Sequence, residues 1–305
     1  MKDKKLKRYK ALLGDRKVYE MDAEEAHEKI SKEIGEMCRH CAEKRWYHRL
    51  IFLNVLMVAG VIAGVIYEIV KEKADDWGNG ELPDPIGISV YGIIVFVIGI
   101  LGIYYLNAKY RANAVRITEN NFPEVYEIIE EYSNKLGIAV PKAYIMQGNG
   151  SLNAFSTFLF KRQWISINAE VFEVAYREHK DMDSLKFVIA HELSHIYYGH
   201  ATLRYNLPIW FADKVPVIGS TASRAREYSC DRLAQRLTGV DGIDTMLMLT
   251  IDRHLYKFVD KEDYLREMKQ QKGFFVWFAN LIADHPLICK RVWALKKGRG
   301  SGALY

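Results

Sequence analysis

Cysteine is scarce in this chain, and four irregularly spaced residues among 305 exclude a disulfide framework. Cys38 and Cys41 flank His40 at metal-ligand spacing, but a zinc ribbon needs a second such pair. Cys230 and Cys289 stand alone and far away. We therefore predict free thiols on a charged helical segment, consistent with a reducing compartment. Pairing between chains through this segment, by zinc or by a disulfide, stays open.

A strong net charge is also lacking, since 43 Lys and Arg against 38 Asp and Glu give +5. Six basic residues crowd the first ten positions, but a solvated or membrane-flanking tail explains them better than a nucleic-acid partner. No secretory signal peptide is expected, because almost fifty residues precede the first apolar run and many are charged. The sequence contains no internal repeat and no low-complexity tract. We expect no nucleic-acid partner.

Two long apolar runs stand out against this polar background. Residues 50–70 read LIFLNVLMVAGVIAGVIYEIV, with Asn54 and Glu68 as the strongly polar members. Residues 86–106 read IGISVYGIIVFVIGILGIYYL and carry no charge. Each run has about the 20 residues that cross a bilayer, and each is apolar all round, unlike the striped helices of a soluble core. We predict a transmembrane helical hairpin over residues 49–106.

The hairpin would separate a charged segment, residues 1–48, from a soluble domain, residues 107–305. Lys and Arg flank the two runs on their outer sides, whereas the two lysines of the connecting loop are offset by acids. The positive-inside rule then places both outer zones in the cytoplasm. We predict a multi-pass protein of the cell membrane whose N-terminus and soluble domain are cytoplasmic.

Residues 107–305 have the pattern of an α+β domain, mainly helical with a small β-sheet. A helix is expected from Pro123 to Gly137, since proline suits a first helical turn and glycine a helix end. Alternating patterns predict strands at 142–147, 153–160 and 163–168. Further helices are expected around 169–178, 184–199, 222–238, 241–257, 261–270 and 286–297.

The helix expected at 184–199, with Ser184 as its N-cap, contains the string His191-Glu192-Leu193-Ser194-His195. Two histidines four residues apart lie on one helix face, because the helical repeat is 3.6 residues. Two imidazoles on one face can hold one zinc ion, and the adjacent glutamate can reach a water on that ion. A zinc peptidase needs this arrangement.

A third ligand must come from elsewhere in the chain. The pattern H-E-x-x-H-x-x-G-x-x-H is excluded, because Tyr198 and Ala201 stand where it needs glycine and histidine. His200 is one residue short, and we predict that it ends the helix as a cationic group suited to the helix dipole. Glu227 could be a carboxylate ligand, and Asp231, one helical turn on, could accept the second ring N–H of a ligating histidine. Alternatively, both are surface acids that pair with neighbouring arginines.

Four motifs share their order with one known family. They are Asn153-Ala154-Phe155 on a strand, His191-Glu-Leu-Ser-His195, Arg224-x-x-Glu227-x-x-x-Asp231, and His285-Pro286 followed by Arg291. Together they cover about residues 115 to 297. In this order they resemble the HtpX / CAAX-prenyl-endopeptidase family of integral-membrane zinc metallopeptidases.

This resemblance implies a zincin-type fold of the gluzincin class that holds one zinc ion. It implies zinc ligands at His191, His195 and Glu227, with Glu192 as the base. It also implies that the strand at 153–155 lies beside the cleft and pairs with an extended protein or peptide substrate.

One departure from the family pattern limits what can be carried over. HtpX-type members have a second pair of spans after the H-E-x-x-H helix, but residues 204–220 here, RYNLPIWFADKVPVIGS, are too short and too interrupted to span. The multi-span chamber of the prenyl-protein proteases is absent too. Neither HtpX quality control nor CAAX processing is therefore carried over. Trp210 and Phe211 are expected to cover the cleft or to touch the bilayer, and residues 274–279 to be core or interfacial.

These residues suggest a mechanism and three readings of function. Glu192 would take the proton of an attacking water, and His285 would stabilise the oxyanion, unless it is a structural residue at a helix start. Arg291 would anchor its segment to a carboxylate. The leading reading is a membrane-anchored zinc endopeptidase that cleaves membrane or membrane-proximal proteins. The alternatives are a membrane-tethered adaptor with an inactive or structural zinc site, and a zinc-dependent regulator or chaperone-like binder that uses residues 1–48.

Overall fold

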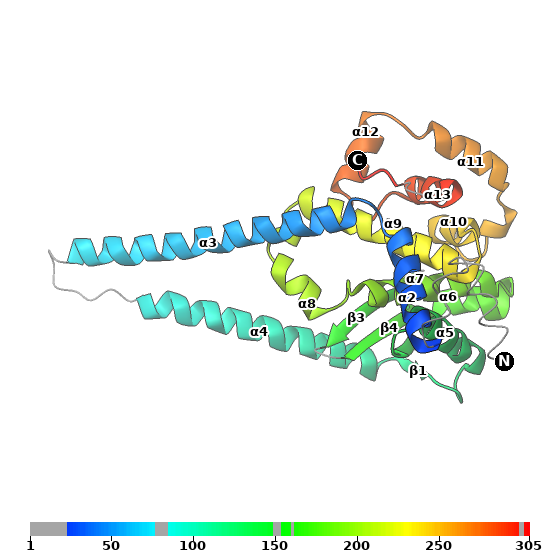
Figure 1. Ribbon diagram of the computed structural model, residues 1–305, viewed down its shortest axis with the longest axis horizontal. Coiled ribbons are helices and arrows are strands. Elements are labelled where there is room, and N and C mark those ends of the chain that lie inside the picture. The colour runs from blue at the N-terminus through cyan, green and yellow to red at the C-terminus, as the bar shows by residue number, and fades with distance from the viewer. Residues whose placement is uncertain (1–22, 77–84, 149–153, 160–161, 299–301) are drawn as a thin grey trace.

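The computed structural model describes residues 23–76, 85–148, 154–159, 162–298 and 302–305. A globular part built mainly of helices lies at one end, and two long helices project from one side of it (Figure 1). Its single described sheet is small, so the predicted α+β class is confirmed.

The sheet has four strands in the order β1-β2-β4-β3. They are β1 (Val115–Ile117), β2 (Lys142–Met146), β3 (Ala154–Leu159) and β4 (Arg162–Asn168). β2 and β4 run parallel, while the other two neighbouring pairs are antiparallel. β3 therefore has β4 on one side and is an edge strand of the described sheet. An edge strand offers backbone N–H and C=O groups for further pairing.

Two helices form the centre of the globular part. α7 (Met182–Tyr198) packs along α9 (Ile218–Thr238) and also contacts β3 and β4. α5 (Pro123–Leu136) covers α7 from the other side; it begins with the expected proline and ends at Gly137 in the left-handed conformation. Burial of apolar side chains from these elements supplies the main driving force for the fold.

Shorter helices surround this centre. They are α6 (Ala169–Glu173), followed by a π-helical turn (Val174–Glu178), α8 (Leu203–Asn206), α10 (Ile243–Ile251), α11 (Lys261–Gln270), α12 (Phe274–Ile282) and α13 (Ile288–Lys297), with 3₁₀ turns at Leu207–Ile209, Ala212–Lys214 and Tyr256–Phe258.

Two expectations about these helices were wrong, and one helix was not expected. The N-cap of α7 is Asp181 and not Ser184, because the helix begins at Met182 and the Asp181 carboxylate accepts the backbone N–H of Ser184 at 3.1 Å. The helix expected at 241–257 ends at Ile251, since Asp252 has a φ of 133° that no helix continues. Residues 274–282 form a helix of their own that the sequence reading did not assign.

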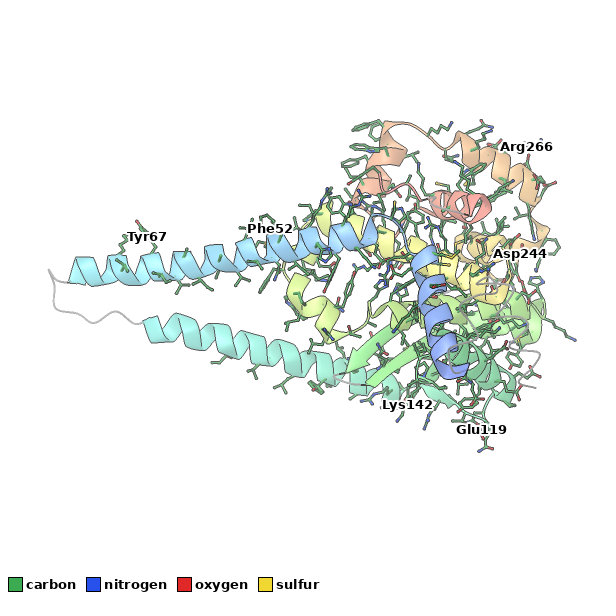
Figure 2. All side chains as sticks on the ribbon, viewed as in Figure 1. Phe52, Tyr67, Glu119, Lys142, Asp244 and Arg266 are labelled. Carbon is green, nitrogen blue, oxygen red and sulfur yellow. The ribbon has the colours of Figure 1, made fainter. Side chains whose placement is uncertain are left out.

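The two projecting helices are α3 (Glu43–Asp76) and α4 (Pro85–Ala112). In the part of the chain that the structure describes, α3 is the one helix that is long and apolar enough to cross a bilayer, over Glu43–Tyr67. Its apolar side chains are largely exposed beyond residue 54, and Figure 2 shows Phe52 and Tyr67 pointing away from the rest of the protein. One candidate span is therefore supported, while the two-span hairpin over residues 49–106 stays a prediction.

The segment before the candidate span packs on the globular part. α2 (Ala23–Cys38) lies against α5 and α9. The Tyr198 hydroxyl donates to the carbonyl of Gly35 at 2.7 Å, and the Ser31 hydroxyl donates to the carbonyl of Leu136 at 2.7 Å. A side chain at Gly35 would collide with the ring of Tyr197, so glycine permits this close approach. The described part of residues 1–48 thus contributes to the domain surface instead of extending away from it.

Candidate active site

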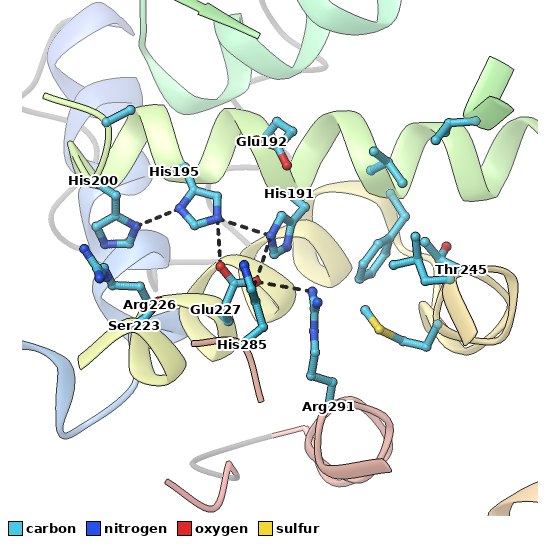
Figure 3. A pocket seen from close by; sticks show the side chains of 16 residues that line it. His191, Glu192, His195, His200, Ser223, Arg226, Glu227, Thr245, His285 and Arg291 are labelled. Carbon is cyan, nitrogen blue, oxygen red and sulfur yellow. Dashed lines mark hydrogen bonds and ion pairs between the residues drawn. The ribbon is translucent and has the colours of Figure 1, made fainter. Parts of the chain in front are cut away.

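His191, Glu192 and His195 lie on α7 where it faces α9, and they line a cavity of about 480 Å³ (Figure 3). The four-residue spacing brings the two imidazoles together as predicted, with their Nε2 atoms 3.2 Å apart. Glu192 is 6% exposed and belongs to the same cavity wall. The three polar residues of the H-E-x-x-H string therefore line the same cavity.

Glu227 reaches this pair of histidines from α9. Its carboxylate oxygens lie 3.5 Å from His191 Nε2 and 3.4 Å from His195 Nε2. His191, His195 and Glu227 each offer one ligand atom, and these three atoms lie within 4.8 Å of one another. Glu227 is 4% exposed and Asp231 is 1% exposed, so the alternative that they are surface acids is wrong.

The neighbouring arginines are engaged elsewhere. Arg224 donates to backbone carbonyls, among them that of Leu304 at 2.8 Å. Arg226 pairs with Asp213 at 3.1 Å. Neither forms the surface pair with Glu227 or Asp231 that the alternative reading required.

Asp231 lies behind His191, on the side away from His195. Its Oδ1 is 3.0 Å from His191 Nδ1. Arg291, on α13, donates to both oxygens of the same carboxylate, at 2.8 Å from Nε and 2.5 Å from Nη2. Arg291 Nη2 is also 3.7 Å from Glu227. Such a two-pronged pair fixes the orientation of Asp231 and, through it, of the His191 ring.

The charges of these groups fit a cation site. Burial raises the pKa of Glu227, but the three neighbouring histidines outweigh burial and hold it well below its usual range. Burial lowers the pKa of His191, but Asp231 and Glu227 raise it to about 10. Two imidazoles and a buried carboxylate at these separations suit zinc, and a metal ion that binds there must displace the proton of His191.

His285 lies at the mouth of the cavity, in the loop between α12 and α13. Its Nδ1 is 3.2 Å from Glu227 Oε2, while 69% of its side chain is exposed. The Glu227 carboxylate raises the pKa of this histidine. The structure therefore brings His285 to the ligand cluster, together with Arg291 from the next helix.

The dipole role expected for His200 was wrong. This residue follows the helix-ending Gly199 and is 6% exposed. Burial lowers its pKa to about 4, so the ring is neutral. Its Nδ1 lies 3.1 Å from His195 Nδ1 and its Nε2 lies 3.2 Å from Glu43 Oε1. The sequence reading missed Glu43 altogether, because no local pattern links it to a histidine 157 residues away.

Of the residues expected to bind substrate, Asn153 falls outside the described residues. Ala154 and Phe155 lie on β3, opposite Ile167 and Ser166 of β4. β3 is an edge strand of the described sheet and contacts α7, the helix that carries the two histidines. The substrate role of this strand stays a prediction.

Comparison with known proteins shows which family the chain resembles. Residues 119–209 match peptidase family M48. A protein named "Protease HtpX homolog" from Streptococcus gordonii is 26% identical over 199 residues, which are 61% of this chain and 58% of that protein. Another of the same name from Archaeoglobus fulgidus is 21% identical over 284 residues, 81% of this chain and 79% of that protein. The chain is similar to the HtpX-like M48 metallopeptidases.

Within this HtpX-like chain, the M48 match contains the H-E-x-x-H string and ends before α9 begins. The places of Glu227, Asp231, His285 and Arg291 therefore rest on the geometry described above. The chain spans less than two thirds of the streptococcal relative, with 58% of that protein covered.

Proposed function

We propose that this chain is a membrane-anchored zinc endopeptidase that hydrolyses peptide bonds in membrane or membrane-proximal proteins. The observation that carries the proposal is the cluster of His191, His195 and Glu227, held within metal-ligand distance beside Glu192 in one cavity. Similarity to the HtpX-like M48 peptidases supports the same chemistry.

The chain's own residues divide the work of peptide hydrolysis. Zinc, when bound by His191, His195 and Glu227, supplies a Lewis acid that polarises the scissile carbonyl and acidifies a water molecule. Glu192 accepts the proton of the attacking water and delivers it to the leaving amine. His285, at the cavity mouth, donates a hydrogen bond to the oxyanion of the tetrahedral intermediate.

An extended substrate would enter along the edge of β3. Addition of a peptide strand to a sheet edge uses main-chain hydrogen bonds, which are insensitive to sequence and suit an endopeptidase with varied substrates. The contacts between β3 and α7 would place that backbone beside Glu192.

Anchoring to the membrane is supported by the exposed apolar surface of α3. In this proposal residues 204–220 do not form a second span beside α3. They are held to α3 by hydrogen bonds. Asn54 of α3 accepts the backbone N–H groups of Phe211 and Ala212, at 2.9 and 3.2 Å. Trp210 and Phe211, 42% and 54% exposed, would then lie at the level where α3 enters the lipid, with the catalytic cavity on the cytoplasmic side.

A chelator distinguishes this function from the adaptor reading. Removal of zinc from the purified full chain should abolish peptide cleavage, because Glu192 then lacks an acidified water to deprotonate. Addition of zinc should restore cleavage. Hydrolysis of a fluorogenic peptide in detergent micelles measures both.

A chain that binds one zinc ion and cleaves no peptide or membrane-protein substrate would support the adaptor instead. Cleavage that persists at full rate in metal-free protein would contradict the proposed chemistry.

Replacement of His285 by alanine tests the oxyanion role. We expect kcat to fall by about 10²- to 10³-fold, as for the loss of one oxyanion donor, with zinc content unchanged. The matched control is His48→Ala, which removes an exposed histidine on α3 outside the cavity. Full activity of His285→Ala, or loss of zinc from it, would remove the oxyanion role.

A further inference from the structure

A buried chain of polar groups leads from the metal-site histidine His195 to the first residue of the candidate membrane span. We propose that Glu43, acting through His200, positions His195 and fixes the tautomer in which it binds the metal. The inference rests on the proposed role of His195 as a metal ligand. Both Glu43 and His200 are thus positioning residues.

The contacts of this chain are continuous. His195 Nδ1 is 3.1 Å from His200 Nδ1, and His200 Nε2 is 3.2 Å from Glu43 Oε1. Glu43 is 2% exposed and His200 is 6% exposed. Glu43 is itself held by an ion pair with Arg39 and by a hydrogen bond from the Ser229 hydroxyl.

The ion pair with Arg39 sets the direction of the hydrogen bonds. It keeps Glu43 a carboxylate, which can only accept, so His200 must donate from Nε2–H. The Nδ1 atoms of His195 and His200 lie 3.1 Å apart, so one of them donates to the other. Because His200 carries its proton on Nε2, its Nδ1 accepts the Nδ1–H of His195. His195 is left with its lone pair on Nε2, the atom that faces His191 and Glu227. The opposite tautomer would set a bare nitrogen of His200 against the Glu43 carboxylate.

The two histidines of the H-E-x-x-H string are therefore backed in parallel ways. Asp231 lies behind His191 and is held by Arg291. Glu43 lies behind His195 with the imidazole of His200 between them, and it is held by Arg39. Carboxylates behind metal-binding histidines orient the ring and raise its basicity, and their loss costs about 10- to 100-fold in metal affinity.

This arrangement joins the metal site to the membrane anchor. Glu43 begins α3, the helix that contains the candidate span, and Arg39 precedes it in the turn after α2. The metallopeptidase domain predicted at residues 107–305 would lack both groups. The segment before the span is then part of the active-site architecture and not only a tail.

A second reading of the same cluster is a separate metal ion held by His195, His200 and Cys230. Ligand atoms of these three lie within 4.8 Å of one another. Cys230 Sγ is 3.7 Å from His200 Nδ1, and burial raises the pKa of this thiol well above its usual range. His195 could serve both ions only as an imidazolate, with Nε2 on the first ion and Nδ1 on the second, which favours the hydrogen-bonded chain.

The test measures zinc affinity of the full chain in detergent by competition with a chromogenic chelator. His200→Phe removes both hydrogen bonds and should weaken zinc binding by about 10- to 100-fold. His200→Asn keeps an acceptor near Nδ1 and should recover most of that loss. Glu43→Gln, which removes the charge that sets the tautomer, should also weaken binding. Thermal unfolding of the metal-free proteins verifies that each variant folds. If His200→Phe does not fold, the zinc affinity of Glu43→Gln tests the proposal.

Cys230→Ala is the matched control, equally buried beside His200, and should bind zinc within about twofold of the unchanged chain. The proposal is overturned if His200→Phe and Glu43→Gln bind as tightly as that control. It is also overturned if His200→Asn is as weak as His200→Phe, or if the unchanged chain holds two zinc ions and Cys230→Ala one. A chain that shows the expected zinc affinities but cleaves nothing contradicts the proposed function alone.

Discussion

Replacement of Glu192 by glutamine should lower peptide cleavage by about 10²- to 10⁴-fold while zinc stays bound. Glutamine has nearly the shape of glutamate but cannot accept the proton of the attacking water. Glu192 is not among the three residues whose ligand atoms converge, so the metal site stays intact. Zinc content of the purified variant and its rate of peptide hydrolysis measure the two effects separately.

The matched control is Glu173→Gln, which changes an acid outside the cavity that pairs with Arg253. It should cleave at the rate of the unchanged chain. Cleavage retained in zinc-loaded Glu192→Gln would remove Glu192 as the base and with it the proposed mechanism.

The sequence could predict the centre of this site because local geometry determines it. The helical repeat alone places His191 and His195 on one face, and one turn separates Glu227 from Asp231 on α9 in the same way. The sequence could not show that these two faces meet. That depends on the packing of α7 along α9, which follows from the burial of many apolar side chains at once.

His200 shows where local reasoning failed. At the end of a helix a histidine suits the dipole, and the sequence offered no reason to bury it. Burial became favourable because Glu43, 157 residues earlier, and His195 both complement its ring. Such long-range pairing between polar groups leaves no periodic pattern to read.

The N-terminal third was only partly predictable for a related reason. Apolar length identifies α3 as a candidate span, but it does not tell where the protein surface ends and the lipid begins. In the proposed anchoring, Asn54 would lie at that boundary, because it accepts hydrogen bonds from the 211–212 backbone. A polar residue inside an apolar run can therefore indicate a contact with the globular domain, and it does not by itself argue against a membrane span.

Replacement of Arg291 by methionine should destabilise the metal-free chain by about 3–5 kcal/mol, because it leaves Asp231 as a buried carboxylate without its arginine. Asp231 is 1% exposed, and Arg291 donates two hydrogen bonds to it. Burial raises the pKa of Asp231, but Arg291 outweighs burial and lowers it. The stability that this pair contributes is present above the usual aspartate pKa and is lost as the pH falls through the lowered one. Urea unfolding in detergent micelles, followed by tryptophan fluorescence, gives the free energy of unfolding.

Arg266→Met is the matched control, since Arg266 pairs with Asp263 where both side chains are more than 60% exposed. An exposed pair contributes about 0–1 kcal/mol, so this variant should unfold close to the unchanged chain. Equal losses in the two variants at neutral pH would contradict the prediction, and they would mean that protonated His191 alone compensates Asp231.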